Sequence, residues 1–111
     1  MIKLPPIYRR TWKLTIEILE TGSKFPKQYR PTIARRLESA SLDLLIGLRQ
    51  SLLGSGDSFK NLLGFIDEIK VLMGVAFELR LLSPGRNENL NEEIVVIGKI
   101  LGSLSKSSNK R

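Results

Sequence analysis

The chain has 111 residues and a formal net charge of +7, and it contains neither cysteine nor histidine. The missing thiols exclude disulfides and thiolate zinc sites, and the missing imidazoles remove the commonest general base and metal ligand. No run approaches the roughly 20 apolar residues that span a bilayer, and no signal-peptide pattern opens the chain, so we expect one cytosolic domain without a membrane partner.

A first helix is predicted from the two prolines at positions 5 and 6 to about Thr21. Proline suits a first helical turn, because its missing N–H would have no partner there. Gly22 ends this helix, and a loop follows through Lys27. Two adjacent stripes show helical spacing, one of Tyr8, Trp12, Thr15 and Leu19 and one of Ile7, Leu14 and Ile18.

A second helix is predicted over about residues 31–53, and a start a few residues earlier also fits the pattern. Its apolar residues recur at three- and four-residue steps: Ile33, Leu37, Ala40, Leu44, Leu48 and Leu52. After a glycine-rich break, Asp57 or Ser58 offers a side-chain oxygen that would cap a third helix. The third helix runs to about Leu82, where a Ser-Pro-Gly sequence would stop it.

Apolar residues cover more of the third helix than one bundle core needs. The main stripe consists of Phe59, Leu62, Ile66, Ile69, Met73 and Ala76. It is widened by Leu63, Phe65, Val71, Leu72, Val75, Leu79 and Leu81. A helix at the surface of a lone bundle shows only one apolar stripe, so the excess favours contact with another subunit over a merely central position.

The fourth helix is predicted to begin with Asn89 or Asn91 as its cap. Glu92 and Glu93 would then lie in its first turn, where the helix dipole favours anions. Its apolar stripe consists of Leu90, Ile94, Ile97, Leu101 and Leu104.

No segment shows the period-two alternation of a half-buried strand, and the predicted loops are short. Short connections make neighbouring helices antiparallel, so the predicted fold is all-α, an up-down-up-down four-helix bundle. Residues 1–105 would form this bundle, and residues 106–111 a frayed basic tail. Glycines inside the helices are expected to mark close helix approach: Gly47, Gly64, Gly74, Gly98 and Gly102.

Paired acids are the remaining candidates for catalysis. Glu17 and Glu20 are three residues apart, and Asp67 and Glu68 are adjacent. Paired carboxylates can perform acid–base chemistry or hold Mg²⁺, but cations lie about one turn from the first pair, which is typical of a solvated helix face. No phosphate-binding glycine loop or zinc spacing occurs. We therefore expect no catalytic site, metal or cofactor, and an enzyme using these acids is the third alternative.

Positive charge is concentrated at the N-terminal end of the chain. Residues 1–36 hold nine Lys and Arg against two Glu, whereas residues 37–105 hold six against nine acids. Arginine forks grip phosphate oxygens and lysines add point charge, so a basic strip along the first two helices would hold nucleic acid. The candidate contacts are Arg9, Arg10, Lys13, Lys24, Lys27, Arg30, Arg35 and Arg36. The alternative is a basic surface that serves solubility alone.

Two aromatic residues, Phe25 and Tyr29, lie among these charges. Their rings would either stack on bases or close the bundle end as hydrophobic plugs, and the plug is the favoured interpretation. No recognition helix or aromatic RNA-binding signature is present. We therefore expect recognition of backbone and shape, with weak sequence preference.

Two stretches carry a family resemblance, the loop Phe25-Pro26-Lys27 and the Ile-Gly-Lys-Ile-Leu-Gly-Ser-Leu run of residues 97–104. With four helices of this length, the chain resembles the four-helix-bundle family of accessory variability determinant (Avd) proteins and proteins encoded in intervening sequences of bacterial 23S ribosomal RNA genes. The ribosomal branch carries Asn-Ile-Ala-Glu-Gly in its second helix. Residues 39–47 here read Ser-Ala-Ser-Leu-Asp-Leu-Leu-Ile-Gly, which favours the Avd branch.

The resemblance implies a non-catalytic accessory protein of a diversity-generating retroelement, encoded by a bacterium or phage. Avd proteins form pentameric rings with a basic surface and associate with a reverse transcriptase and template RNA, and so support mutagenic complementary-DNA synthesis. The family has no motif that identifies binding residues here. The alternative function is a protein–protein scaffold of the ribosomal-intervening type, whose basic strip docks an acidic protein and has no nucleic-acid role.

Overall fold

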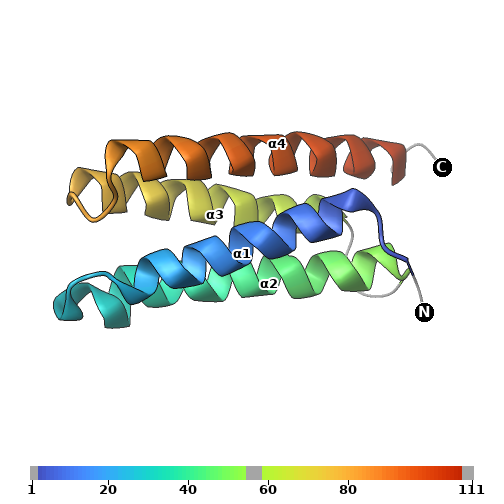
Figure 1. Cartoon of the computed structure of the whole chain (residues 1–111). Helices are drawn as coiled ribbons and strands as arrows, with labels where there is room; N and C mark the ends of the chain where they lie inside the picture. Colours follow the sequence, from blue (N-terminus) through green and yellow to red (C-terminus); the bar gives the residue numbers. More distant parts are fainter. Residues whose placement is uncertain (1–2, 55–58, 109–111) are drawn as a thin grey trace.

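The helical spacing of apolar residues is realised as four long helices. The computed structural model describes residues 3–54 and 59–108, and these ranges contain no strand. The element order is α1 (Pro6–Ser23), η1 (Lys27–Tyr29), η2 (Arg30–Ala34), α2 (Arg35–Leu52), α3 (Phe59–Glu78) and α4 (Pro84–Ser108). Consecutive long helices run antiparallel (Figure 1), which confirms the predicted all-α four-helix bundle.

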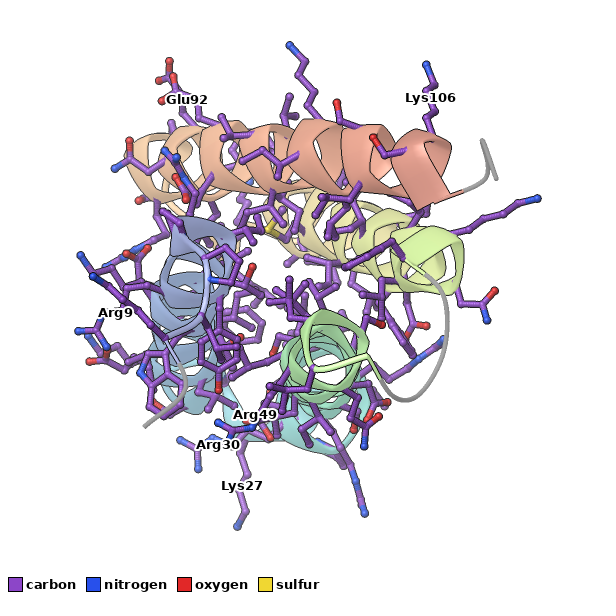
Figure 2. All side chains as sticks on the ribbon, turned by 90° about the vertical axis from the view of Figure 1, so that its right-hand side faces the viewer. Arg9, Lys27, Arg30, Arg49, Glu92 and Lys106 are labelled. Carbon is purple, nitrogen blue, oxygen red and sulfur yellow. The ribbon has the colours of Figure 1, made fainter. Side chains whose placement is uncertain are left out.

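The four helices surround one core. α2 packs against both α1 and α3, and α3 packs against α4, whereas α1 meets α4 over a shorter stretch. Seen along the bundle, the helices follow one another around the core side chains, so each has one outward side (Figure 2). Over the described ranges, no helix combines the length and apolarity needed to cross a membrane.

The buried side of α1 follows the second of its two predicted stripes. Ile7, Leu14 and Ile18 are buried in the core. Two buried threonines lie between them, and their hydroxyls donate to carbonyls four residues earlier in the helix. Tyr8 is half-buried at the edge of this side, and Trp12 is 42% exposed. Tyr8 and Trp12 therefore flank the core of the bundle.

Helical structure begins before α2, at the earlier of the two starts that the sequence allowed. Lys27–Tyr29 form a 3-10 turn, and Arg30–Ala34 form a π turn that leads directly into α2. Pro31 lies at the start of the π turn, where its missing N–H leaves no hydrogen bond unmade. A Cβ on Gly22 would lie 3.4 Å from the Ala34 Cβ, so the π turn lies against the end of α1.

The predicted apolar excess of α3 divides between the core and the surface. Its buried residues are Leu62, Ile66, Ile69, Leu72, Met73 and Ala76. Val71 and Val75 face outward instead, and Val71 is 66% exposed. Gly64 and Gly74 lie near this outward side, and a Cβ on either would meet nothing within 4 Å. Four uncharged positions of α3 are therefore open to solvent.

Close helix approach explains only some of the helical glycines. A Cβ on Gly47 would lie 2.7 Å from Leu62 Cδ2, so α2 and α3 come together here because the side chain is missing. A Cβ on Gly98 would lie 3.4 Å from Ile66 Cγ2. Within one chain the same prediction is wrong for Gly64, Gly74 and Gly102, because no atom of another helix lies within 4 Å of the added carbon.

α3 ends four residues before its predicted end. Arg80 has a positive φ of 62°, and its amide donates to the Phe77 carbonyl at 2.9 Å. The Leu81 amide donates to the Ala76 carbonyl at 2.8 Å. These two bonds form a Schellman motif, which closes the helix before the Ser-Pro-Gly sequence is reached.

Replacing Arg80 with glycine should stabilise the protein, because a residue with a Cβ is strained at positive φ and glycine is not. We expect Arg80→Gly to raise the free energy of unfolding by about 0.5–1 kcal/mol, measured by urea denaturation followed by circular dichroism. Arg80→Ala keeps the Cβ and controls for the lost charge. Equal stabilisation by the two variants would contradict the backbone explanation.

α4 begins earlier than predicted, and the expected caps Asn89 and Asn91 are wrong. The Ser83 hydroxyl accepts a hydrogen bond from the Arg86 amide at 3.1 Å. Pro84 occupies the first turn, which it suits because it lacks an N–H. The Asn91 side chain donates to the Asn87 carbonyl within the helix.

This earlier start also places Glu92 and Glu93 well inside α4, beyond its first turn. At the other end, α4 continues through Ser108, so the helix includes the first residues of the predicted tail. Residues 109–111 lie outside the described residues, as do the expected α3 caps Asp57 and Ser58.

Candidate nucleic-acid interface

The eight predicted phosphate contacts do not share one direction. The Arg10 Nε donates to Glu93 Oε1 on α4 at 2.5 Å. The Arg36 guanidinium lies 3.8 Å from Glu68 Oε2 on α3. Each of these arginines is therefore turned toward a neighbouring helix and has its charge opposed by a carboxylate. Neither therefore belongs among the cations that stand outside ion pairs.

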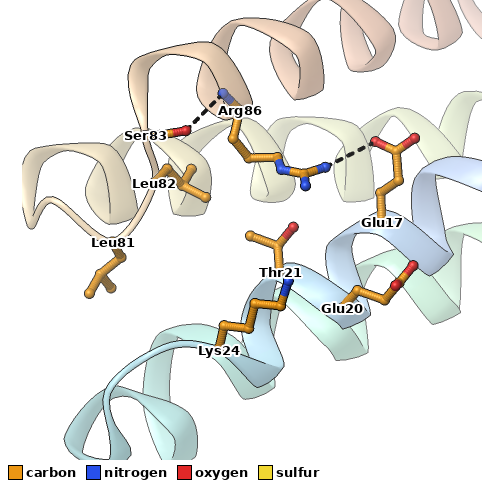
Figure 3. A pocket seen from close by; sticks show the side chains of 8 residues that line it. All are labelled: Glu17, Glu20, Thr21, Lys24, Leu81, Leu82, Ser83 and Arg86. Atoms are coloured by element: carbon orange, nitrogen blue, oxygen red, sulfur yellow. Dashed lines mark hydrogen bonds and ion pairs between the residues drawn. The ribbon is translucent and has the colours of Figure 1, made fainter.

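Lys24 is a third predicted cation that lies near carboxylates. It lines a hollow between the end of α1 and the turn that joins α3 to α4 (Figure 3). Glu17 and Glu20 line the same hollow, and Glu17 lies 3.9 Å from the guanidinium of Arg86. Cations and anions are mixed at this hollow, so it offers no net attraction for a polyanion.

Both acidic pairs lie on the surface. Glu17 pairs with Arg86, and Glu68 pairs with Arg36. Their partners in sequence, Glu20 and Asp67, are exposed. Among residues 3–54 and 59–108, no three side chains of metal-binding type come together.

The remaining five predicted cations lie on the outer side of α1, of α2 and of the turn between them, which η1 and η2 form. Figure 2 shows Arg9 projecting outward from α1, and Lys27 and Arg30 projecting beyond α2. The Arg30 Nε donates to the Phe25 carbonyl at 3.1 Å, which fixes the guanidinium against the turn. Lys13 follows Arg9 by four residues and therefore continues its side of α1. Arg35, at the start of α2, is exposed.

Two cations of this surface escaped the sequence prediction, Lys3 and Arg49. Arg49 follows Arg35 by 14 residues, so both lie on nearly the same side of α2, about 21 Å apart. Arg49 also lines a hollow together with Arg9 and Lys3. The helical spacing from Arg35 is a signal for Arg49, but Arg49 belongs to the acidic middle of the sequence, where a count of charges along the chain hides it.

We name this surface the basic face, and it consists of Lys3, Arg9, Lys13, Lys27, Arg30, Arg35 and Arg49. All seven side chains are exposed, and none forms an ion pair with another described residue. Glu20 interrupts the face on α1. On the outer side of α4, by contrast, the exposed Glu88 and Glu92 are balanced by the exposed Lys99 and Lys106, and Figure 2 shows Glu92 and Lys106 away from Lys27 and Arg49. The excess of positive charge therefore lies on the side of α1 and α2, although Arg9 and Lys13 also line a hollow with Glu17, Glu92 and Glu93.

The aromatic residues divide between the core and the basic face. Phe25 is only 2% exposed, and Tyr29 is half-buried against the core. The interpretation of Phe25 as a plug is confirmed, because a buried ring cannot stack on a base. Trp12 is exposed instead, with its ring centroid 6.1 Å from that of Tyr8 and the two planes at 58°.

Apolar side chains lie among the cations of the basic face. Ile46 on α2 is 55% exposed, and Leu42, Leu53 and Ile16 are also exposed. Leu42 lies midway between Arg35 and Arg49 at seven-residue spacing, so all three share one side of the helix. The face is therefore amphipathic, and it can contact a partner through both charge and apolar area.

Fold and surface together define an all-α bundle with one cationic, partly apolar side. Comparison with protein-family models, curated proteins and solved structures finds no match to this chain.

Proposed function

We propose that this protein is a non-catalytic accessory factor that binds nucleic acid on its basic face. The observation that carries the proposal is the gathering of seven exposed cations, unpaired with described carboxylates, on the outer side of α1, the turn and α2. Cations held outside ion pairs keep their charge available for phosphate oxygens. Arginines supply four of the seven and grip phosphate through two nitrogens at once.

The proposed biological setting is a diversity-generating retroelement. In that setting the face binds template RNA or complementary DNA, and the protein acts beside the reverse transcriptase during mutagenic synthesis. The setting is supported by the sequence resemblance in residues 25–27 and 97–104. The phosphate contacts themselves depend only on the geometry of the basic face.

A homo-oligomer, with the pentameric ring of the resemblance as its form, belongs to the same proposal. It is supported by the outward side of α3, where exposed Val71 and Val75 lie near solvent-facing glycines. Apolar area of this kind is commonly covered by another subunit. Repetition of the basic face around a ring would raise the effective affinity for a long polyanion. A monomeric mass in light scattering would remove this part of the proposal.

A salt titration tests nucleic-acid binding. We expect the protein to retain a labelled RNA or DNA oligonucleotide at about 50 mM salt, and to lose affinity steeply and linearly in the logarithm of salt concentration. If about four phosphates are contacted, the slope for a single strand is about −3. Fluorescence anisotropy measures both quantities. A flat salt response, or no retention at low salt, would contradict the proposal.

The second candidate function is a scaffold that docks an acidic protein, and the exposed Ile46 and Leu42 favour it. An interface with a protein buries apolar side chains at its centre and places charges around them. Charge reversal at Arg35 and Arg49 would then weaken the protein partner and leave nucleic-acid retention unchanged. The same variants would abolish retention if the basic face holds phosphates.

A further inference from the structure

Trp12 is the one tryptophan of the chain, and it is exposed on the basic face. Trp12 lines one hollow of about 290 Å³ on α1 together with Arg9, Lys13, Ile16 and Glu17. The neighbouring Tyr8 ring is half-buried, and it packs at a tilt against Trp12 with 6.1 Å between centroids. A large planar ring is therefore supported on one side by Tyr8, and two cations and the Glu17 carboxylate line the hollow beside it.

A second hollow, of about 560 Å³, adjoins this region. Tyr8 and Leu53 give it an apolar lining, and Lys3, Arg9 and Arg49 line it with positive charge. Arg9 lines both hollows, so the two are neighbours on the surface. Figure 2 shows the Arg9 side chain projecting outward from α1 at this place. The combination of an aromatic ring, apolar lining and cations fits a ligand that has both a flat apolar part and a phosphate.

We propose that Trp12 is a stacking platform for an unpaired base, and that the basic face takes single-stranded nucleic acid in preference to a duplex. This inference rests on the proposed function and specifies its ligand. Every base has a π-face, so stacking tolerates any sequence, as expected of a surface without a recognition helix. The bases of a duplex are stacked on one another inside the helix, so a duplex offers Trp12 only its phosphates.

The fluorescence of Trp12 reports the proposed contact directly, because no other tryptophan contributes. We expect an oligonucleotide of about 12 unpaired nucleotides to quench this fluorescence as it binds, and a duplex of the same length to leave it nearly unchanged. Binding itself is followed in parallel by the anisotropy of a label on the nucleic acid. The two measurements separate contact with Trp12 from contact with phosphates.

Substitutions make the test quantitative. We expect Trp12→Ala to weaken single-strand binding about tenfold and duplex binding less than twofold, and Trp12→Phe to keep most of the single-strand affinity. Phe77→Ala is the matched control, because Phe77 is 40% exposed on α3, outside the basic face, and its loss should change neither affinity. Thermal unfolding followed by circular dichroism shows that each variant is folded.

The outcomes distinguish this inference from the proposed function. Single-strand binding without quenching, or equal affinities of Trp12→Ala and the native protein, would overturn the stacking role and leave phosphate binding in place. Equal quenching by single strands and duplexes would overturn the preference. Absence of any binding at low salt would overturn the proposed function and this inference together.

Discussion

Replacing Arg9, Lys13, Arg35 and Arg49 with glutamine is expected to reduce nucleic-acid affinity by about 10²-fold or more at 0.1 M salt. Each cation that contacts a phosphate of a single strand contributes about 0.7 to the salt slope, so the loss of four contacts should reduce the slope by about 3. The four side chains are exposed and unpaired with described carboxylates, so little change in stability is expected. Anisotropy titrations over a range of salt concentrations measure both effects.

The matched control removes four other exposed cations, Lys60, Lys70, Lys99 and Lys106, from α3 and α4. Both variants have a formal net charge of +3, because four positive charges are subtracted from +7. A loss confined to the first variant assigns binding to the basic face. Equal losses would show that only net charge matters, and the proposed interface would then be wrong.

Phe25→Ala is expected to have the largest effect on stability, a loss of about 3–5 kcal/mol in the free energy of unfolding. The ring is 2% exposed, and its residue joins α1 to η1 through two backbone contacts. Its amide donates to the Gly22 carbonyl at 3.1 Å, and its carbonyl accepts from the Arg30 Nε at the same distance. Removing the ring leaves a cavity at this end of the core. Urea denaturation measures the loss, which is a large part of a typical domain's stability of about 5–15 kcal/mol.

Phe77→Ala provides the control, because an exposed phenylalanine should cost less than about 1 kcal/mol. Phe25→Leu, which fills most of the space, should recover much of the loss in Phe25→Ala. If Phe25→Ala were as stable as the native protein but bound nucleic acid weakly, the ring would have the stacking role that its burial argues against.

Much of the fold followed from the sequence because apolar spacing is a property of single helices. The buried residues Leu62, Ile66 and Ile69 could be assigned to the core from periodicity alone. Helix ends were harder to predict. The positive φ of Arg80 could not be predicted, because no glycine occupies that position. Ser83 caps α4, but it belongs to a Ser-Pro-Gly sequence that equally predicts the end of α3.

The candidate site was only partly predictable, because the direction of a surface side chain depends on its neighbours in space. Arg10 and Arg36 lie in the same basic segment of the sequence as most cations of the basic face, yet each forms an ion pair with a carboxylate on a neighbouring helix. Conversely, Arg49 belongs to the acidic segment of the chain, and folding brings it to the same hollow as Arg9. Charge counted along the sequence thus predicts that a basic surface exists, whereas the antiparallel packing of α1 and α2 determines which cations lie on it.

The lack of space for a side chain at Gly47 limits how this protein can change over evolutionary time. Leu62 is almost fully buried, so its methyl group has little freedom to yield to a new carbon only 2.7 Å away. Positions 47 and 62 therefore share one fixed volume between two helices. Among descendants of this chain, a larger residue at position 47 should appear only together with a smaller one at position 62, whereas packing within one chain sets no such limit at positions 64 and 74.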